Sequence, residues 1–430
     1  MSISITSSAH RISLASEFLM ARRPVMDREQ NIVAHELLFR ETEADAMPSA
    51  AGEEPPAAAS VIADVCQHGM ERVIGDLFGI LYLDADALMS DIFPLLPAQN
   101  DVLEIPEMPE VTQPLLDRME ALRQEGFRFA LVVGNATRQS HELPHRLLPL
   151  VDGVRIDITG RERAELAGFC STFRSHQKQL LAEGVETAGQ FRTCFELGFD
   201  FFQGYYFTRM PAEEMLLPAP SSIAELTALI ASDADSTVIE DRIREDITLG
   251  LNLLRMADAS DIGVHRIESL HQVLMVAGRD RLQRWLQALA DAGHSTHRGM
   301  MPALAQATLR GRLMELIAHK LIPGNRGIAD TGFTVGVMSL MDAMFPMPME
   351  EILRQIPVVD EIRDALLHRE GYFGQLLKLV ESAEWHAGND MQLMQLVRSL
   401  KLSCNELYQL QLAAFEWSDQ VRRNGYWNLP

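Results

Sequence analysis

Several apolar runs in the first half of the chain end in acidic or amide side chains. These residues are Glu36, Asp84, Glu104 with Glu107, Asp157, Glu183 with Glu186, and Gln203. An acid at the end of a buried strand is costly unless it meets a metal, a cation or a substrate. One such acid would usually be a structural carboxylate with a local partner. Several on one rim would supply the hard oxygen ligands that two divalent cations need, which raises a metal-dependent site as a hypothesis.

One run departs from this pattern. FRFALVVGNAT, residues 127–137, ends at Val132 and Val133 and contains no acid. The next run, VDGVRIDI, carries Arg155 near its end. Valine offers no oxygen to a cation, and the permanently charged guanidinium of arginine repels one. These residues therefore predict that much of the ligand set for metals is missing.

The polar residues need a scaffold that gathers strand ends. Eight candidate strands lie between Glu17 and Phe207, and most are separated by amphipathic segments. This alternation predicts a closed, TIM-like α/β barrel, in which reactive groups stand at the C-terminal ends of the strands. Only MDREQN separates the first two runs, too short for a parallel crossover, so the first strand is predicted to be antiparallel.

The second half lacks strand patterns and is predicted to be all-α. Ile239, Ile243 and Ile247 recur at helical spacing, and similar patterns follow. Methionines recur every three residues from Met338 to Met347, which favours core packing over a groove for a partner. All four tryptophans lie in this half, and Trp427 is the one we expect to be exposed. The Pro- and Ser-rich segment TRMPAEEMLLPAPSSI predicts that the two halves are separable.

These patterns divide the chain into segments. They are a disordered N-terminus (1–16), a barrel (17–211), a linker (212–221), a helical domain (222–420) and a C-terminal tail (421–430).

Composition limits the classes of function. Acids outnumber bases by 60 to 38, and the net charge of −22 argues against non-specific binding of nucleic acid. The four scattered cysteines form no CxxC pair, which favours buried free thiols. The N-terminus lacks the apolar core of a signal peptide, and no stretch is long and apolar enough for a membrane span. We therefore expect a cytoplasmic protein.

Ordered motifs between residues 17 and 211 resemble the EAL family of cyclic di-GMP phosphodiesterases. HELLFR carries the pattern Glu-x-Leu-x-Arg as Glu36, Leu38 and Arg40. LEIPE is similar to the family's Glu-Ile-Thr-Glu, RID to Lys-Ile-Asp, AEGVET to Ala-Glu-Gly-Val-Glu-Thr, and FFQGYYF to its Gln-Gly-Tyr end. The resemblance implies a barrel that binds cyclic di-GMP and two metals.

The resemblance assigns roles residue by residue. It implies that Glu36 and Glu104 are metal ligands, that Glu183 is the catalytic carboxylate of its loop, that Arg40 contacts a phosphate, and that Gln203 lines the pocket. Four positions depart from the family pattern: Arg23 replaces Gln, Asp84 replaces Asn, Val132 and Val133 replace Asp-Asp, and Arg155 replaces Lys. We therefore expect no metal cofactor and no phosphodiester hydrolysis.

The second half resembles the HDOD domain, a relative of HD-type phosphohydrolases that lacks their metal ligands. The resemblance rests on EDITLGLNLLRMADAS, RIESLHQVLMVAG and GVMSLMDAMFPMPMEEILRQIPV, with Ile247 in place of Pro and Asp258 in place of Asn. None of the thirteen histidines is followed by Asp. His294 and His297 have a spacing that would suit a metal, but without a third ligand they favour loop histidines.

The sequence thus predicts an inactive EAL barrel joined to an HDOD domain, which acts in signalling through protein partners of the HDOD domain. Two alternatives remain open. Arg23, Arg40 and Arg155, with Gln203, could hold cyclic di-GMP without metal, or a weak phosphodiesterase activity could survive. If cyclic di-GMP binds, the arginines contact its phosphates. The interpretation we favour is instead that Arg40 and Arg155 pair with Glu36, Asp84 and Glu104.

Overall fold

The computed structural model describes most of the chain between Phe18 and Asn424. The described residues are 18–41, 70–90, 93–96, 98, 101–107, 111–133, 145–208, 217–256, 266–291, 302–345, 347–384 and 390–424. The N-terminal segment predicted to be disordered, Arg40's side chain, His294, His297 and Trp427 lie outside what the structure describes.

All eight predicted strands form, and they close into one barrel in the order of the sequence. The strands are β1 (Phe18–Met26), β2 (Ile32–Glu41), β3 (Phe78–Tyr82), β4 (Asp101–Pro106), β5 (Arg128–Val133), β6 (Gly153–Asp157), β7 (Gln179–Glu183) and β8 (Phe201–Gln203). β1 is antiparallel to both β2 and β8, and every other pair is parallel. The predicted fold and the antiparallel first strand are therefore confirmed.

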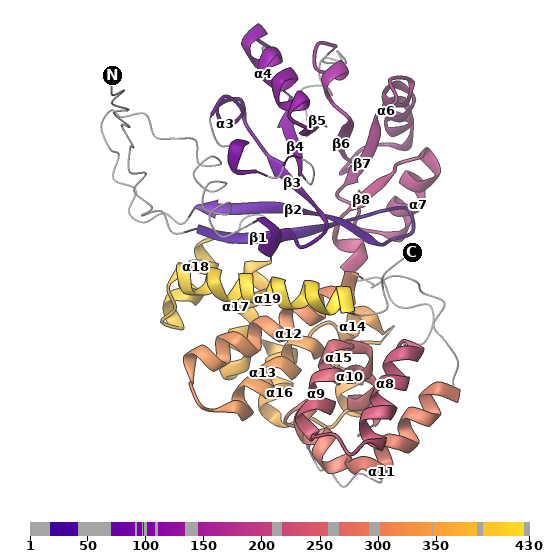
Figure 1. Cartoon of the computed structure of the whole chain (residues 1–430), viewed down its shortest axis with the longest axis vertical. Helices are drawn as coiled ribbons and strands as arrows, with labels where there is room; N and C mark the ends of the chain where they lie inside the picture. The colour runs from indigo at the N-terminus through magenta and orange to yellow at the C-terminus, as the bar shows by residue number, and fades with distance from the viewer. Residues whose placement is uncertain are drawn as a thin grey trace, which may run out of the picture.

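The helices of the barrel half, residues 18–208, cover the outside of the sheet (Figure 1). They are α2 (Met70–Ile74), α3 (Ala85–Leu88), α4 (Gln113–Gln124), α6 (Arg163–Ser175) and α7 (Ala188–Leu197), with short 3-10 turns η1 (Phe93–Leu95), η2 (Leu148–Leu150) and η3 (Tyr205–Thr208). Alternate strand residues pack outward against these helices, as Leu103 and Leu131 do. The residues between them face the lumen, where Val25 and Ile80 belong to a separate small cluster.

This alternation separates the two valines that stand where acids were expected. Val133 is fully buried and belongs to the outer core between the sheet and the helices. Val132, one residue earlier, is therefore on the lumen side of β5. Of the pair, Val132 alone faces the lumen in the described strand, and the predicted loss of ligands at the centre rests chiefly on it.

The helical half, residues 217–424, contains helices and no strands among its described residues. The helices are α8 (Pro220–Ala231), α9 (Ser236–Glu245), α10 (Ile247–Met256), α11 (Leu270–Asp291), α12 (Pro302–Leu321), α13 (Arg326–Met338), α14 (Met341–Met344), α15 (Met349–Gln355), α16 (Asp360–His368), α17 (Gly371–Ala383), α18 (Asp390–Ser399) and α19 (Cys404–Asn424). Met338, Met341 and Met344 are at most 1% exposed, and the partly buried Met347 packs against the same helical core, so the methionine stripe is core, as predicted.

The last helix joins the two halves. α19 lies along β1 and α2, beneath the barrel in the view of Figure 1. Its Tyr408, Leu412 and Phe415 are buried in the core of the barrel, and Gln411 donates a hydrogen bond to the backbone oxygen of Met20 at 2.8 Å. Separable halves remain a prediction, but an apolar stripe at the far end of the chain completes the barrel's core, which argues against it.

The same junction contains a buried ion pair. Arg22 of β1 binds both carboxylate oxygens of Asp419, at 2.8 and 3.0 Å, and its guanidinium lies 4.3 Å from the centre of the Phe415 ring. Gly75 adopts a φ of +67°, and a Cβ there would stand 2.9 Å from the Asp419 carboxylate. Glycine is required at this position by both the backbone and the close approach of Asp419.

Two further helix boundaries differ from the predicted segments. α8 begins at Pro220, within the predicted linker, and α19 continues to Asn424, beyond the predicted end of the helical domain. Proline is favourable in the first turn of a helix, which explains the start of α8 at Pro220. The apolar stripe of α19 favours helix past the predicted end of the domain.

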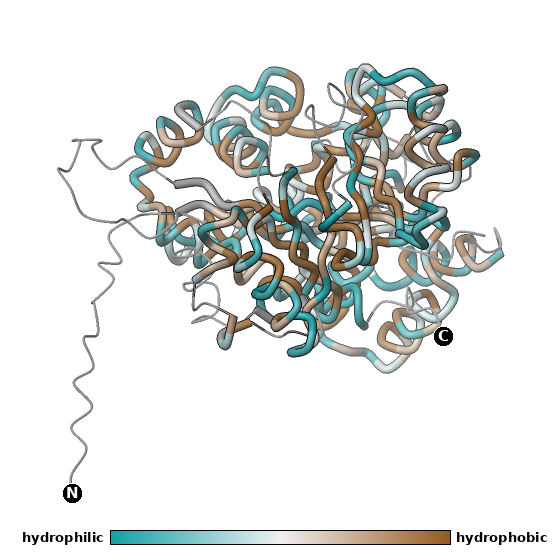
Figure 2. The backbone as a smooth tube through the Cα atoms, turned by 90° about the horizontal axis from the view of Figure 1, so that it is seen from above, coloured by the Kyte–Doolittle hydropathy of each residue, from teal (hydrophilic) through white to brown (hydrophobic). Residues whose placement is uncertain are grey.

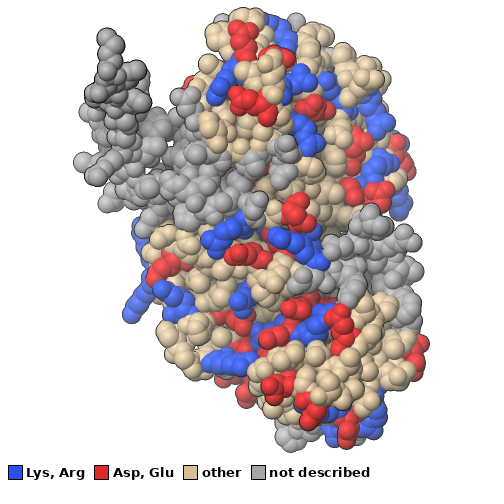
Figure 3. All heavy atoms as spheres, viewed as in Figure 1, with Lys and Arg blue, Asp and Glu red and all other residues tan. Residues whose placement is uncertain are grey.

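The distribution of polar residues is that of a folded globular chain. Hydrophobic segments run through the interior in Figure 2, and Figure 3 shows acidic and basic side chains mixed over both halves of the visible face. Among the described residues, no single helix has the length and apolar character needed to cross a membrane; one helix pair bent by 117° meets that test jointly, by length and composition only.

Candidate functional site

Six polar side chains meet inside the barrel, toward the C-terminal ends of its strands. We call them the polar layer: Arg23, Glu36, Glu104, Arg155, Glu183 and Gln203. Five different parallel strands and the antiparallel β1 each contribute one member. The sheet register explains the meeting, because Arg23 pairs with Glu36 across β1 and β2, and Glu183 with Gln203 across β7 and β8.

Arg155 occupies the centre of this layer. Its Nη1 atom lies 2.8 Å from Glu36 and 3.7 Å from Glu183, and its Nε atom lies 3.0 Å from Glu104. The residue is only 3% exposed, while Glu36 is 3% and Glu104 1% exposed. A guanidinium thus stands among three carboxylates, where the family resemblance implies metal ions. Such a contact both neutralises the acids and keeps other cations away.

Arg23 and Gln203 complete the network around Glu36. Arg23 Nη2 donates to Glu36 at 2.7 Å and to Glu183 at 3.0 Å, and Gln203 Nε2 donates to Glu36 at 2.9 Å. The expected pairing of Arg155 with the leftover acids is present. Arg23 joins it, although its sequence position was interpreted as a contact for ligand phosphate.

Burial and charge set the protonation of the layer. Burial opposes the charge of Glu36, but Arg155 and Arg23 together hold the pKa of Glu36 below its ordinary value. Burial raises the pKa of Glu104 to about 8 despite its contact with Arg155, with the Glu36 and Glu183 charges adding to the rise. Burial also opposes the charge on Arg155, yet the surrounding carboxylates raise its pKa further. Arg155 therefore stays charged.

Other predicted site residues lie elsewhere. Asp84 is exposed, and its carboxylate caps the N-terminus of α3 by accepting a hydrogen bond from the Ala87 backbone at 2.8 Å. Asp157 is exposed and accepts from the Thr159 backbone, and Glu186 is exposed in the loop after β7. The strand ends alone did not distinguish side chains on the lumen from those that fold back on their own loops.

The helical half covers the mouth of the barrel. A cavity of about 840 Å³ lies between them, with Arg23, Glu183 and Gln203 on the barrel side and Arg310, Asp342 and Arg369 on the helical side. Arg310 contacts Glu384 at 2.5 Å, and Arg369 contacts Glu381 at 2.9 Å. Sequence reasoning missed these helical residues, because no local pattern signals that α12 and α17 approach the barrel.

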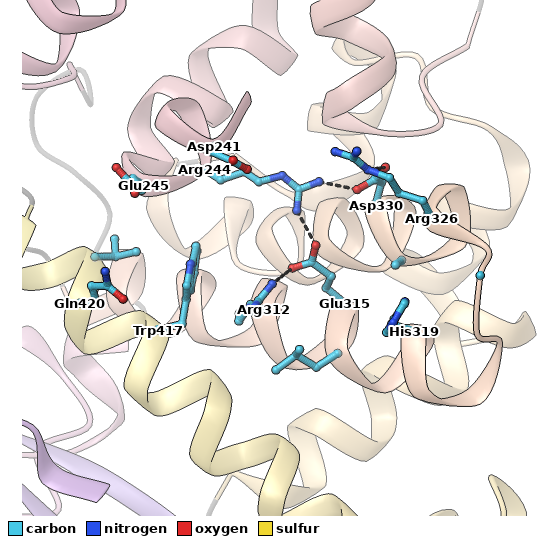
Figure 4. Close-up of a pocket in the computed structure, with 14 residues that line it drawn as sticks. Asp241, Arg244, Glu245, Arg312, Glu315, His319, Arg326, Asp330, Trp417 and Gln420 are labelled. Carbon is cyan, nitrogen blue, oxygen red and sulfur yellow. Dashed lines mark hydrogen bonds and ion pairs between the residues drawn. The ribbon is translucent and has the colours of Figure 1, made fainter. Parts of the chain in front are cut away.

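A second polar cluster lies wholly within the helical half. Oxygen and nitrogen atoms of Glu240, His271 and Asp330 lie within 4.8 Å of one another, a spacing that metal ligands can have. However, Arg244 reaches Glu240 at 2.7 Å. It also contacts Asp330 at 2.5 Å and Glu315 at 2.7 Å, and Figure 4 shows these two contacts. As in the barrel, a buried arginine satisfies the acids, and the cluster is interpreted as an ion-pair network.

Comparison with known proteins identifies the barrel half. Residues 90–210 match the model of the EAL domain family. The barrel half contains an EAL domain. The match extends from before β4 of the EAL domain to just beyond η3 and includes four members of the polar layer, Glu104, Arg155, Glu183 and Gln203.

Two relatives match the EAL domain and the helical half together. The uncharacterized protein YuxH of Bacillus subtilis is 26% identical over 408 residues, which cover 93% of this chain and 97% of the relative. The cyclic di-GMP phosphodiesterase CdgJ of Vibrio cholerae is 26% identical over 417 residues, covering 94% and 93%. The crystal structure of the B. subtilis YkuI protein, with an EAL domain and bound cyclic di-GMP and calcium, is 22% identical with a TM-score of 0.37, over 44% of this chain and 55% of that one.

Proposed function

We propose that the protein is a catalytically inactive cytoplasmic signalling protein, in which an EAL domain and an HDOD domain form one unit that binds protein partners. The observation that carries this proposal is the position of Arg155, whose guanidinium lies 2.8 Å from Glu36 and 3.0 Å from Glu104. Hydrolysis by a pair of metals needs those carboxylates as free ligands. With Val132 on the lumen side of β5, no acid compensates at that position.

The relative CdgJ is named a cyclic di-GMP phosphodiesterase, and we expect this chain to differ from CdgJ in lacking that activity. We expect the purified full-length chain to release no linear dinucleotide from cyclic di-GMP with Mg²⁺ or Mn²⁺, because Arg155 holds the acids that would bind the metals. Product would be followed by chromatography, with CdgJ as the positive control. Product above the level without enzyme, lost in Glu36→Gln, would contradict the proposal.

A metal-free receptor for cyclic di-GMP is the alternative function. The cavity at the barrel mouth is large enough for a small-molecule ligand, at about 840 Å³. Its arginines are already paired, and Arg23 would have to leave Glu36 and Glu183 to bind a phosphate. We therefore expect weak binding or none in a calorimetric titration of the full chain. Tight binding that is lost in both Arg23→Gln and Arg40→Ala would favour the receptor instead.

Both halves expose large apolar side chains among the described residues, and on the helical half three of them, on two contacting helices, support partner binding there. Val238 of α9 is 45% exposed, and Met275 and Val276 of α11 are 54% and 44% exposed, on helices that contact each other. Apolar groups grouped on an otherwise polar surface are typical of interaction sites. The proposed surface lies on the helical half and away from the elements that pack on the barrel.

We expect Met275→Asp in the full chain to abolish capture of the protein's partners from cells of the source organism. A buried aspartate at a contact is poorly tolerated, since its charge loses water without gaining a partner. Capture would be measured by affinity purification and mass spectrometry. Met89→Asp is the matched control, because Met89 is 50% exposed on the barrel half. If Met89→Asp abolished capture of the partners and Met275→Asp did not, the partner-binding surface would lie on the barrel half.

A further inference from the structure

The lumen of the barrel is hollow below the polar layer. A cavity of about 350 Å³ opens at the N-terminal end of the barrel, where Phe78, Arg128 and Phe201 begin their strands, and extends inward to Glu104 and Arg155. Small side chains at Ala34, Ala130 and Gly153 leave this space, in a fold whose lumen is ordinarily filled by layers of bulky residues. The volume is near the lower end of small-molecule pockets.

The walls and the inner end of this lumen cavity differ in chemistry. Val25, Ile80, Val102 and Leu181 make the walls apolar. The inner end is polar: among the described residues, neither Arg155 Nη2 nor Glu104 Oε2 has a hydrogen-bond partner, although both atoms are buried. Buried polar atoms without partners are costly. A molecule that reached the inner end with a hydrogen-bonding group would therefore gain more than apolar contact.

The charges of the polar layer determine which group fits. Two arginines, Arg23 and Arg155, face three carboxylates, Glu36, Glu104 and Glu183. Because burial raises the pKa of Glu104 to about 8, that carboxyl is mostly protonated at pH 7, and the two arginines balance Glu36 and Glu183. An added anion or cation would therefore leave the buried layer with an unbalanced charge. A neutral group avoids both penalties. It can accept from Arg155 Nη2 and, with a donor on the same group, bond to Glu104 Oε2.

We propose that the lumen cavity binds a small neutral molecule that has an apolar body and a terminal group able both to accept and to donate hydrogen bonds, such as a carboxamide. The carboxamide lies against Arg155 and Glu104, and the apolar body fills the lumen toward Phe78 and Phe201. This site opens at the end of the barrel opposite the mouth cavity. It does not depend on whether cyclic di-GMP is bound or hydrolysed.

The polar layer also separates the two cavities. Glu104 and Arg155 line the lumen cavity, whereas Arg23, Glu183 and Gln203 line the mouth cavity under the helical half. A ligand that contacts Arg155 Nη2 from below acts on the same guanidinium that holds Glu36 and Glu183 from its Nη1 atom. The lumen site is thus placed to influence the mouth of the barrel.

Three probes of one shape test the proposal on the full chain. They are naphthalene-2-carboxamide, naphthalene-2-carboxylate and 2-ethylnaphthalene, which differ only in the terminal group. We expect the carboxamide to bind about tenfold more tightly than either analogue, since a lost hydrogen bond to a charged group has about this effect. Binding would be measured by titration with ligand-detected NMR. Equal binding of 2-ethylnaphthalene, or tighter binding of the carboxylate, would overturn the proposal.

Two variants locate the binding. Ala130→Leu and Ala34→Leu fill the lumen from different strands, and Ala85→Leu, an exposed change on α3, is the matched control. We expect both lumen variants to abolish carboxamide binding and the control to retain it. Their melting temperatures should be unchanged or raised, whereas added bulk in a filled core lowers stability. Three outcomes would contradict the site. They are a lowered melting temperature in both lumen variants, unchanged carboxamide binding in those variants, and no binding of any probe to the wild type, which is expected of a cavity that holds only water.

Discussion

Replacing Asp419 with alanine is expected to lower the free energy of unfolding of the full chain by about 3–5 kcal/mol, the usual cost of removing one partner of a buried ion pair. The Asp419 and Arg22 side chains are 3% and 5% exposed, and the contact joins both carboxylate oxygens to the guanidinium. Without Asp419, Arg22 keeps the Val73 backbone oxygen and the Phe415 ring but has no counter-charge described beside it.

Denaturant unfolding, followed by circular dichroism, would measure this effect. Glu416→Ala on the same helix is the matched control, because Glu416 and its partner Arg72 are 55% and 45% exposed and such surface pairs contribute little. Because α19 completes the core of the barrel, we also expect both halves to unfold in one transition. Two separate transitions, with Asp419→Ala changing neither, would show that the junction is weak and that the halves behave independently.

The barrel was predictable because its signals are local. Each run such as FGILY in β3 or QLLAE in β7 has the length and apolar character of a buried strand, and the short MDREQN connection required an antiparallel start. The burial of the methionine stripe was predictable because flexible apolar side chains fill cores, even though Met338 ends α13 and Met341 and Met344 lie on α14. Periodicity determines which face is buried even where the partner is unknown.

The junction of the halves was not predictable in this way. Tyr408, Leu412 and Phe415 have the same helical spacing as side chains that pack within the helical half, and nothing local says that they contact the barrel. The Pro- and Ser-rich composition of the linker suggested that the two halves are independent, but the composition of a linker carries no information about contacts between the segments it connects. Whether the apolar face of α19 is buried depends on contacts between residues almost 400 positions apart in the sequence, such as the hydrogen bond between Gln411 and the backbone of Met20.

The candidate site was predicted in part. The sequence brought Glu36, Glu104, Glu183 and Arg155 to one rim, and the structure places them in one network. It did not distinguish Asp84, which caps α3, from the acids that point into the lumen. Asp84 lies two residues beyond β3, where it is the N-cap of α3, whereas Glu36, Glu104 and Glu183 lie within their strands, and the register of the closed sheet directs them to the lumen.

Replacing Arg155 with methionine is the sharper test of the polar layer. Methionine has a similar reach but no charge, so Glu104 loses its nearest described cation, and Glu36 and Glu183 keep Arg23. We expect a loss of about 3–5 kcal/mol in the free energy of unfolding at pH 8, because a buried carboxylate remains without its counter-charge. The exposed change Arg163→Met, which breaks a surface pair with Glu196, should have little effect.

The pH dependence and a second substitution distinguish lost charge from lost packing. Without Arg155, the pKa of Glu104, already raised to about 8 by burial, rises further in the folded chain, and Glu36 loses the cation that contributes most to lowering its pKa. In the wild type, the lowered pKa of Glu36 adds stability that is present above its ordinary pKa and is lost as pH falls through the lowered value, so the deficit of Arg155→Met should shrink between pH 8 and pH 4. Arg155→Met with Glu104→Gln should recover part of the loss at pH 8, since the uncharged amide needs no counter-ion. A deficit that is the same at both pH values, with no recovery in the double variant, would mean that Arg155 supports the barrel through packing alone, and it would remove the reason to regard the centre of this EAL domain as neutralised by charge.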